Sequence, residues 1–246
     1  MPVIVSHVAS TGAALRSVAV LPARGGSKRI PRKNVRVMNG RPLIAWAIEG
    51  ALASGAFDAV VVSTDDPEIA DVSRAAGALV PFERPAHLAD DHASTGSVIA
   101  HAVGELRAQG TLSAADDLLC CVYPAAIGVR PEDFARGRAL LVAGEVPYVT
   151  TVVRYAHPIQ RAMDIDERGR IQLIDPSASS QRTQDLPPRW HDAGQFYWGR
   201  VGAWSAGLPI FPNSLALELA AAEVLDIDTE DDWRRAEGLH ALRLGR

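Results

Sequence analysis

A basic, glycine-containing stretch near the start of the chain carries the strongest chemical signal. Residues 24–34 contain five cations between Arg24 and Lys33, although the whole chain has a formal net charge of −4. Gly25 and Gly26 allow the backbone to turn tightly and to approach a ligand. Cations on such a backbone suit a polyphosphate, so the stretch predicts a phosphate-binding loop, with a solvated basic turn as the alternative. It has neither the ending of a Walker A loop nor the glycine spacing of a dinucleotide-binding loop.

A second signal is a pair of carboxylates near the other end of the chain, Asp226 and Asp228. Residues two apart in a strand point to the same side, so both carboxylates can reach one point. Hard oxygen ligands held close together suit Mg²⁺, which completes its shell with waters and phosphates. The alternative is a solvated or capping role, and Thr229 with Asp232 does resemble a capping box. Together with a polyphosphate loop, the pair predicts metal-assisted phosphoryl chemistry.

These residues need a sheet to position them. Apolar runs alternate with amphipathic stretches, a pattern typical of a mostly parallel sheet with helices on both faces. Strands are predicted at residues 18–21, 59–63, 78–80, 118–123, 148–154, 196–198 and 223–227. Helices are predicted at residues 42–54, 67–76, 95–106, 131–143, after 198 and from about 230. Ligands of such sheets bind beyond the carboxyl ends of the strands, where the basic stretch, Thr64 to Asp66, Tyr123 and Asp228 are expected.

Length and composition fit one α/β domain, because the chain has 246 residues, of which 48% are hydrophobic and 22% charged. Residues 1–16 are predicted to be a loose extension and residues 17–246 a single domain. Residues 155–195 hold several prolines and a hairpin turn at 165–171, which predicts an insert or flap. Cys120 and Cys121 are adjacent and predict two inert core thiols in a reducing cytoplasm.

The bulk properties also argue against two classes of partner. A pI near 6.0 argues against general nucleic-acid binding, which needs a broadly basic face. No apolar run reaches the roughly 18 residues needed to span a bilayer, and the first 16 residues do not resemble a signal peptide. We therefore expect neither a nucleic-acid nor a membrane partner.

The order of the motifs resembles the acylneuraminate cytidylyltransferase family, the CMP-sialic acid synthetases. The matching segments, from about residue 17 to the end, are the basic stretch, residues 62–65, Arg84-Pro85 with Leu88, Asp91 and Ser94, and residues 226–229. The resemblance implies a nucleotide-diphospho-sugar transferase-like three-layer sandwich with a mixed, mostly parallel sheet and a small β-rich insert. Residues 191–198, residues 155–161 and the adjacent cysteines resemble the branch of the family that acts on pseudaminic acid.

The resemblance also implies a role for each matching position. Four residues would be catalytic: Arg24, Lys28, Lys33 and Asp228. Asp226 and Asp228 would carry Mg²⁺. The nucleotide, CTP, would be bound by Arg24, Gly25, Gly26, Ser27, Lys28, Asn34, Arg84 and Thr95. The sugar candidates, for each of which a structural role is an equal alternative, are His157, Gln160, Arg182, His191, Gln195 and Tyr197.

The implied reaction joins CTP to an acidic nine-carbon 2-keto sugar and releases pyrophosphate. The implied assembly is a cytoplasmic homodimer whose insert serves dimerisation and sugar binding. Two alternatives stay open: the same reaction on N-acetylneuraminic or legionaminic acid, and a non-catalytic nucleotide-binding module. One departure bears on both, because the family's Thr/Ser-rich turn is replaced at residues 123–128 by Tyr-Pro-Ala-Ala-Ile-Gly.

Overall fold

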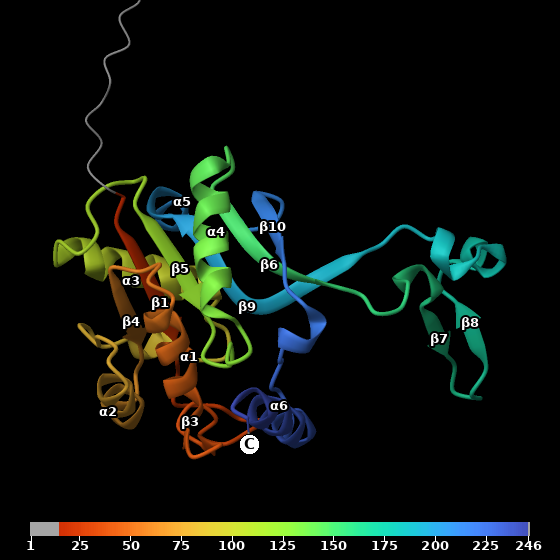
Figure 1. Ribbon diagram of the computed structural model, residues 1–246, viewed down its shortest axis with the longest axis horizontal. Helices are drawn as coiled ribbons and strands as arrows, with labels where there is room; N and C mark the ends of the chain where they lie inside the picture. Colours follow the sequence, from red (N-terminus) through yellow and green to blue (C-terminus); the bar gives the residue numbers. More distant parts are fainter. Residues whose placement is uncertain (1–14, 246) are drawn as a thin grey trace, which may run out of the picture.

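The fold is built on one six-stranded sheet (Figure 1). The computed structural model describes residues 15–245, so the predicted extension at residues 1–16 lies almost wholly outside the described residues. The strand order is β10-β6-β9-β5-β1-β4, with β9 antiparallel to both of its neighbours and the other pairs parallel. The strands are β1 (Ser17–Pro22), β4 (Ala59–Ser63), β5 (Leu118–Val122), β6 (Tyr148–Arg154), β9 (Trp190–Arg200) and β10 (Ser214–Glu218). This confirms the predicted mixed, mostly parallel sheet.

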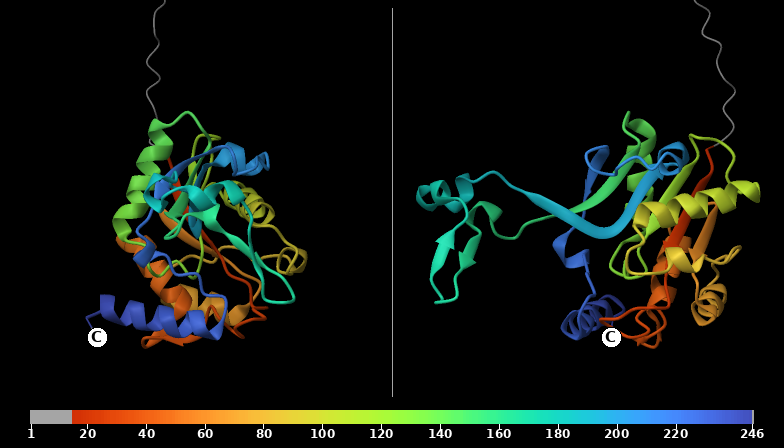
Figure 2. Two further views of the ribbon diagram at one scale, coloured as in Figure 1. Left: turned by 90° about the vertical axis from the view of Figure 1, so that its right-hand side faces the viewer. Right: turned by 180° about the vertical axis from the view of Figure 1, so that it is seen from behind.

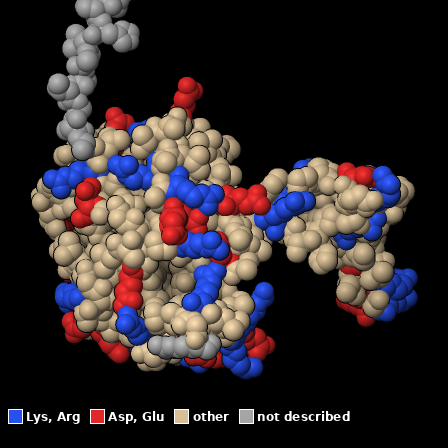
Figure 3. All heavy atoms as spheres, viewed as in Figure 1, with Lys and Arg blue, Asp and Glu red and all other residues tan. Residues whose placement is uncertain are grey.

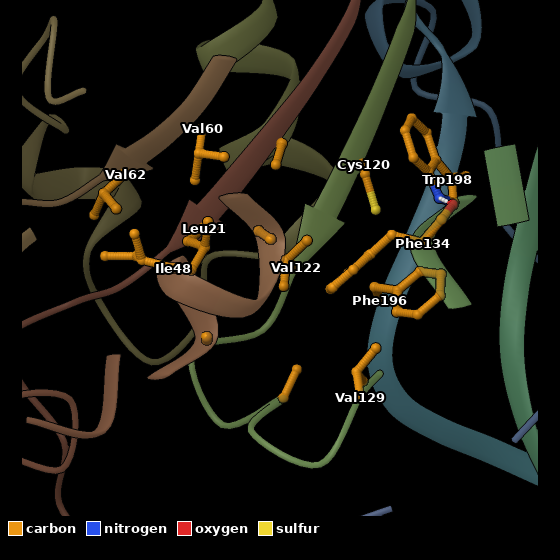
Figure 4. Close-up of a cluster of buried hydrophobic side chains, with 14 of the residues drawn as sticks. Leu21, Ile48, Val60, Val62, Cys120, Val122, Val129, Phe134, Phe196 and Trp198 are labelled. Carbon is orange, nitrogen blue, oxygen red and sulfur yellow. Dashed lines mark hydrogen bonds between the residues drawn. The ribbon is translucent and has the colours of Figure 1, made fainter. Parts of the chain in front are cut away.

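Helices cover both faces of the sheet, as predicted for a three-layer sandwich. One face carries α1 (Leu43–Ala53), α2 (Pro67–Ala75) and α4 (Pro131–Ala143), and the other carries α3 (Thr95–Ala108) and α5 (Val201–Ser205). Side chains alternate along β5, so the Cys120 thiol lies in the first hydrophobic layer, drawn in Figure 4, and the Cys121 thiol in the second. Both thiols are free and buried, which confirms that they belong to the core.

The last helix, α6 (Glu230–Arg243), packs beyond the carboxyl ends of the strands. It lies beside the short hairpin of β2 (Val37–Met38) and β3 (Arg41–Pro42), and a third hydrophobic cluster joins it to Ile30 and Met38. Residues that the sequence separates widely therefore meet at this end of the sheet, which is the lower edge of Figure 1.

Residues 155–189, named the arm here, stand clear of the sandwich (Figures 1 and 2). They contain the antiparallel hairpin of β7 (Met163–Ile165) and β8 (Ile171–Leu173), as the turn at residues 165–171 predicts. β9 leads from the arm into the sheet and is eleven residues long, much longer than the predicted strand at residues 196–198. In Figure 3 the arm joins the body through a narrow neck, with open space below that neck.

Two predicted strands differ from the structure. The strand expected at residues 223–227 is wrong: a short 3-10 turn (Ala221–Glu223) is followed by extended backbone that pairs with no strand, and β10 occupies the sheet edge instead. Its alternating burial arises from packing against α6, because Leu225 and Ile227 lie in the third hydrophobic cluster. The strand expected at residues 78–80 is reduced to a single bridge between Leu79 and Val61. Within residues 15–245, no helix has the length and apolar character needed to cross a membrane.

Candidate active site

Residues 24–34, named the basic loop here, follow directly from the carboxyl end of β1. The Gly25 amide donates a hydrogen bond to Asp65 Oδ1 at 3.2 Å. A Cβ on Gly25 would lie 2.5 Å from Asp66 Oδ2, so this position has no room for a side chain. A Cβ on Gly26 would meet no atom within 4 Å, which leaves open space beside the loop. Asn34 closes the loop, because its Nδ2 donates to the Arg24 carbonyl at 3.0 Å.

One cation of the loop is used to hold its shape. Arg32 has a positive φ of 58° and its guanidinium pairs with both Asp66 and Glu68. The Asp66 carboxylate also caps α2 by accepting from the Ile69 amide at 3.0 Å. The hydrogen bond from Arg32 holds the pKa of Asp66 below its ordinary value, against the opposing effect of burial. Arg32 therefore anchors the loop to α2.

The remaining cations line a cavity of about 300 Å³, together with Asp91 and Asp228. Arg24 Nη1 lies 2.6 Å from Asp91 Oδ1, and the Lys28 ammonium pairs with the same carboxylate. Hydrogen bonds from Lys28 and Arg24 lower the pKa of Asp91. Arg29 pairs with Asp228 at 2.8 Å on the other side. The basic loop and the late carboxylate thus face one common space, with the cations ready to exchange a carboxylate partner for phosphate oxygens.

Asp226 and Asp228 both face Lys33. The Lys33 ammonium donates to the Ile227 carbonyl at 2.7 Å and lies 3.8 Å from Asp228 Oδ1. Burial lowers the pKa of Lys33, although both aspartates oppose this effect. Burial, with the neighbouring charge of Asp228, raises the pKa of Asp226. Asp228 is half-buried and Asp226, although partly desolvated, is exposed, and together the two carboxylates create local negative charge that a cation offsets.

This donor set fits Mg²⁺ better than a metal that needs a protein cage. Within the described part of the chain, no group of three or more His, Cys, Asp or Glu side chains is placed to hold an ion. Mg²⁺ needs no such group, since one or two carboxylates with substrate phosphates and waters are its common arrangement. Asp228 lines the cavity together with four cations, and Asp226 lies two residues before it in the sequence.

A second cavity of about 240 Å³ adjoins the first, and Arg24 and Asp91 line both. Arg84 lies in its wall, 4% exposed, and its guanidinium donates to the Ser63 hydroxyl and carbonyl. Burial lowers the pKa of Arg84 to about 10, which still leaves a cation at neutral pH. Thr95, at the start of α3, lies in the opposite wall.

Tyrosine side chains connect this second cavity to β9. The Tyr123 hydroxyl and Thr95 Oγ1 share a hydrogen bond of 2.8 Å. The Tyr123 ring meets the Tyr197 ring edge-on at 5.7 Å, and the Tyr197 hydroxyl donates to the Asp192 carboxylate. Burial raises the pKa of Tyr123 to about 12, so both groups in its bond to Thr95 stay neutral. Tyr197 is thereby a sugar candidate in direct contact with Tyr123, a residue of the second cavity.

Two further sugar candidates, Gln195 and His191, also lie on β9. The Gln195 carbonyl accepts from the amide of Tyr123, which lines the second cavity, at 2.9 Å, and Gln195 Nε2 lies 3.4 Å from the Leu225 carbonyl. Gln195 is buried, its Nε2 donates to the Ala193 carbonyl at 2.9 Å, and its Oε1 has no hydrogen-bond partner. His191 lies at the outer end of β9, where its ring is 4.7 Å from that of Tyr155.

The last three candidates lie on the arm, apart from the cavities of the same chain. Gln160 donates to the Pro187 carbonyl at 2.9 Å, and Arg182 pairs with Asp185 at 2.7 Å. His157 lies in the bend that leads into the arm. A single chain therefore does not bring these residues together with the basic loop.

Four residues of the site are absent from the sequence-based list: Arg29, Asp91, Tyr123 and Asp192. In the sequence Arg29 is one of five cations in the basic loop, and nothing in its spacing shows that it pairs with Asp228. Asp91 is part of a motif, and nothing in its spacing shows that it pairs with Arg24. Tyr123 and Asp192 gain their importance from contacts between α3, β5 and β9.

Comparisons with known proteins show the family and the fold of the chain. A cytidylyltransferase family model matches residues 18–111. The chain is 37% identical to the pseudaminic acid cytidylyltransferase of Campylobacter jejuni over 92% of this chain and 97% of the relative. It is 30% identical to N-acylneuraminate cytidylyltransferase B of Danio rerio, over 92% of this chain and 52% of the relative. The solved structure of a CMP:2-keto-3-deoxy-manno-octonic acid synthetase complexed with CTP shares the fold, with a TM-score of 0.68, 20% identity and coverage of 93% and 99%.

Proposed function

Because the chain belongs to the cytidylyltransferase family, we propose that it transfers CMP from CTP to pseudaminic acid and releases pyrophosphate. One observation carries the proposal beyond the family: the basic loop and Asp228 line one cavity, and a second cavity of nucleoside size adjoins it. The choice of sugar is supported by the near full-length similarity to a relative of that name.

In the proposed reaction, the anomeric hydroxyl of the sugar attacks the α-phosphorus of CTP. A new oxygen–phosphorus bond forms as the hydroxyl gives up its proton to water. The bond between the α-phosphorus and the oxygen that bridges it to the β-phosphate breaks, and its electron pair leaves with pyrophosphate. Arg24, Lys28 and Lys33 bind the triphosphate. Arg24 and Lys28 exchange their ion pairs with Asp91 for phosphate oxygens when CTP binds. Gly25, Gly26 and Ser27 let the backbone approach the phosphates. Positioning and charge stabilisation account for most catalysis of such transfers.

The cytidine half occupies the second cavity, which Arg84 and Thr95 line. Asn34, which holds the Arg24 carbonyl, contacts the cytidine half from the basic loop. Asp226 and Asp228 would hold Mg²⁺, which when bound supplies positive charge to the reacting phosphates. In the same proposal, Gln195, His191 and Tyr197 contact the sugar from the side of β9.

We also propose that the protein acts as a homodimer in which the arm reaches the second copy and brings His157, Gln160 and Arg182 to that copy's sugar site. The arm supports this idea because it exposes large apolar side chains away from the body: Ile165 is 72% exposed and Ile171 67%. Exposed apolar surface of this kind marks a protein contact. CTP and an acidic sugar are the proposed small-molecule partners, without nucleic acid or membrane, in the cytoplasm.

Pyrophosphate release from CTP and Mg²⁺ tests the proposal, with pseudaminic, legionaminic and N-acetylneuraminic acids assayed in parallel. We expect release with pseudaminic acid, and its loss in Asp228→Ala. Asp231→Ala is the matched control, because Asp231 is an exposed carboxylate three residues further along, in the first turn of α6, that pairs only with Arg234 among the ion pairs described.

Three results would overturn parts of the proposal. Release with another sugar alone would keep the chemistry and reject pseudaminic acid. Folded protein that binds CTP but releases no pyrophosphate with any of the sugars would favour a nucleotide-binding module. Unchanged turnover in folded Asp228→Ala would reject the metal-binding role of that carboxylate.

A further inference from the structure

We propose that α6 fixes both ends of the segment that carries Asp226 and Asp228, and that Arg243 at the far end of the helix is a positioning residue for these carboxylates. Residues 222–228 are named the carboxylate segment here. The expected effect on catalysis rests on the proposed function. The expected effect on the structure rests only on contacts within the chain.

The near end of the carboxylate segment is fixed by the first turn of α6. The backbone amides of Asp228 and Thr229 both donate to Asp232 Oδ2, at 3.2 and 2.8 Å. The Asp232 amide donates in return to Thr229 Oγ1 at 3.2 Å, which completes a capping box. The main chain at Asp228 is therefore tied to the start of the helix.

The middle of the carboxylate segment is held in place because every second side chain is buried. Leu225 is 5% exposed and Ile227 is fully buried, and both belong to the hydrophobic cluster that contains Trp233 of α6. Neighbouring residues of extended backbone point to opposite sides. Burial of the two apolar side chains therefore turns Asp226 and Asp228 the other way, toward Lys33.

The turn at residues 123–128 supplies the opposite wall of this cluster. Ile127 belongs to the same hydrophobic cluster as Leu225 and Ile227. The turn approaches the carboxylate segment so closely that a Cβ on Gly128 would lie 2.1 Å from the Glu223 carbonyl oxygen. The altered turn thus serves as an apolar support for the carboxylate segment.

Arg243 joins this turn to the far end of the carboxylate segment. One guanidinium nitrogen donates to the Gly128 carbonyl, and the other donates to the Ala222 carbonyl at 3.2 Å. Asp228 is tied to the first turn of α6, whereas Arg243 is the last residue of the same fourteen-residue helix. The carboxylate segment therefore runs back along the helix, held by the capping box at one end and by Arg243 at the other.

Arg243 lines neither of the two nucleotide-sized cavities, so its effect on the reaction passes through the carboxylate segment. Displacement of a reacting or metal-binding group by about 1 Å can reduce the rate by roughly 100-fold. For Arg243→Ala we expect kcat to fall about tenfold, with the KM for CTP changed less than about twofold, because the other anchors remain.

The experiment compares Arg243→Ala with Arg234→Ala, an exposed arginine of the same helix that pairs with Asp231. The first readout is amide hydrogen exchange at residues 222–229 without metal, which does not depend on activity. We expect faster exchange there in Arg243→Ala and no change in Arg234→Ala. The second readout is the separate measurement of kcat and of the KM for CTP.

A second variant tests the same contact from the other side. Gly128→Ala forces the turn away from the Glu223 carbonyl and should speed exchange over the same residues. Unchanged exchange in both Arg243→Ala and Gly128→Ala would overturn the proposal, as would an equal effect of Arg234→Ala. If the wild-type chain releases no pyrophosphate with any sugar, the proposed function fails, whereas the exchange result still decides the structural part.

Discussion

Gly25 and Asp66 are packed so closely that no side chain can be placed between them: a Cβ on Gly25 would lie 2.5 Å from Asp66 Oδ2. The same carboxylate caps α2 and pairs with Arg32. The shape of the basic loop therefore depends on a residue that lies 41 positions away in the sequence.

The two glycines of the loop should respond differently to alanine. Gly25→Ala should displace the loop from Asp66 and reduce kcat/KM for CTP at least about tenfold, because the contact cannot relax without moving the loop. Gly26→Ala meets no atom within 4 Å and should leave the melting temperature nearly unchanged. If Gly26→Ala still weakens CTP binding, Gly26 is needed for approach to the phosphates. Equal melting temperatures and activities for both variants would contradict the packing argument.

The ion pair of Asp66 with Arg32 should make stability depend on pH. The pKa of Asp66 is lowered in the folded state, so its contribution is present above the unfolded-state pKa and is lost as the pH falls through the folded-state value. Asp66→Asn keeps a capping side chain and removes the charge. We expect it to lower the free energy of unfolding by about 1 kcal/mol near neutral pH. The difference from wild type should begin to shrink as the pH falls to about 4, near the unfolded-state pKa, and should vanish only below the folded-state pKa. Urea unfolding across this range measures it, and a constant difference would reject the ion pair as its cause.

The hydroxyl of Tyr123 should contribute to nucleotide binding. Tyr123→Phe keeps the ring contact with Tyr197 and removes the hydrogen bond to Thr95. Loss of one such bond is worth about 0.5–1.5 kcal/mol, so the KM for CTP should rise roughly two- to tenfold. A double-mutant cycle with Thr95→Val checks the pairing: additive effects of the two substitutions would show that the two hydroxyls act independently.

The arm should determine the oligomeric state. Ile165→Asp with Ile171→Asp places charge on two of its most exposed apolar positions, and we expect it to convert a dimer to a monomer in light-scattering measurements. Leu242→Asp is the matched control, because Leu242 is also 72% exposed but lies on α6. A wild-type chain that is monomeric at all concentrations, or a dimer unaffected by the arm substitutions, would reject the proposed assembly.

The sequence was a good guide wherever a local pattern decides the structure. The apolar run at residues 118–123 predicts β5, and Thr229 with Asp232 predicts the capping box of α6. The alternation at residues 223–227 predicted a strand because it records which side chains are buried. It does not record whether the backbone pairs with a strand, and here α6 buries Leu225 and Ile227. The edge strand β10 was missed because its exposed side chains lack a clear apolar run.

The site was only partly predictable for a related reason. The basic loop and the aspartate pair each consist of charged residues that are close together in the sequence, so both could be found from composition and spacing. The pairing of Arg29 with Asp228 and of Arg24 with Asp91 joins residues that are far apart in sequence, and only the fold brings them together. Arg32 also shows that a cation in a phosphate-like motif can be engaged in fixing the loop itself.

The adjacent cysteines of β5 provide a chemical reporter for each layer of the sandwich. Burial raises the pKa of both thiols, which keeps them protonated and slow to react while the fold is closed. Because Cys120 faces one helical layer and Cys121 the other, the alkylation rate of each single-cysteine variant measures how often its own layer opens. Equal alkylation rates would indicate that both layers open in one cooperative event. Unequal alkylation rates would identify the layer that opens more often.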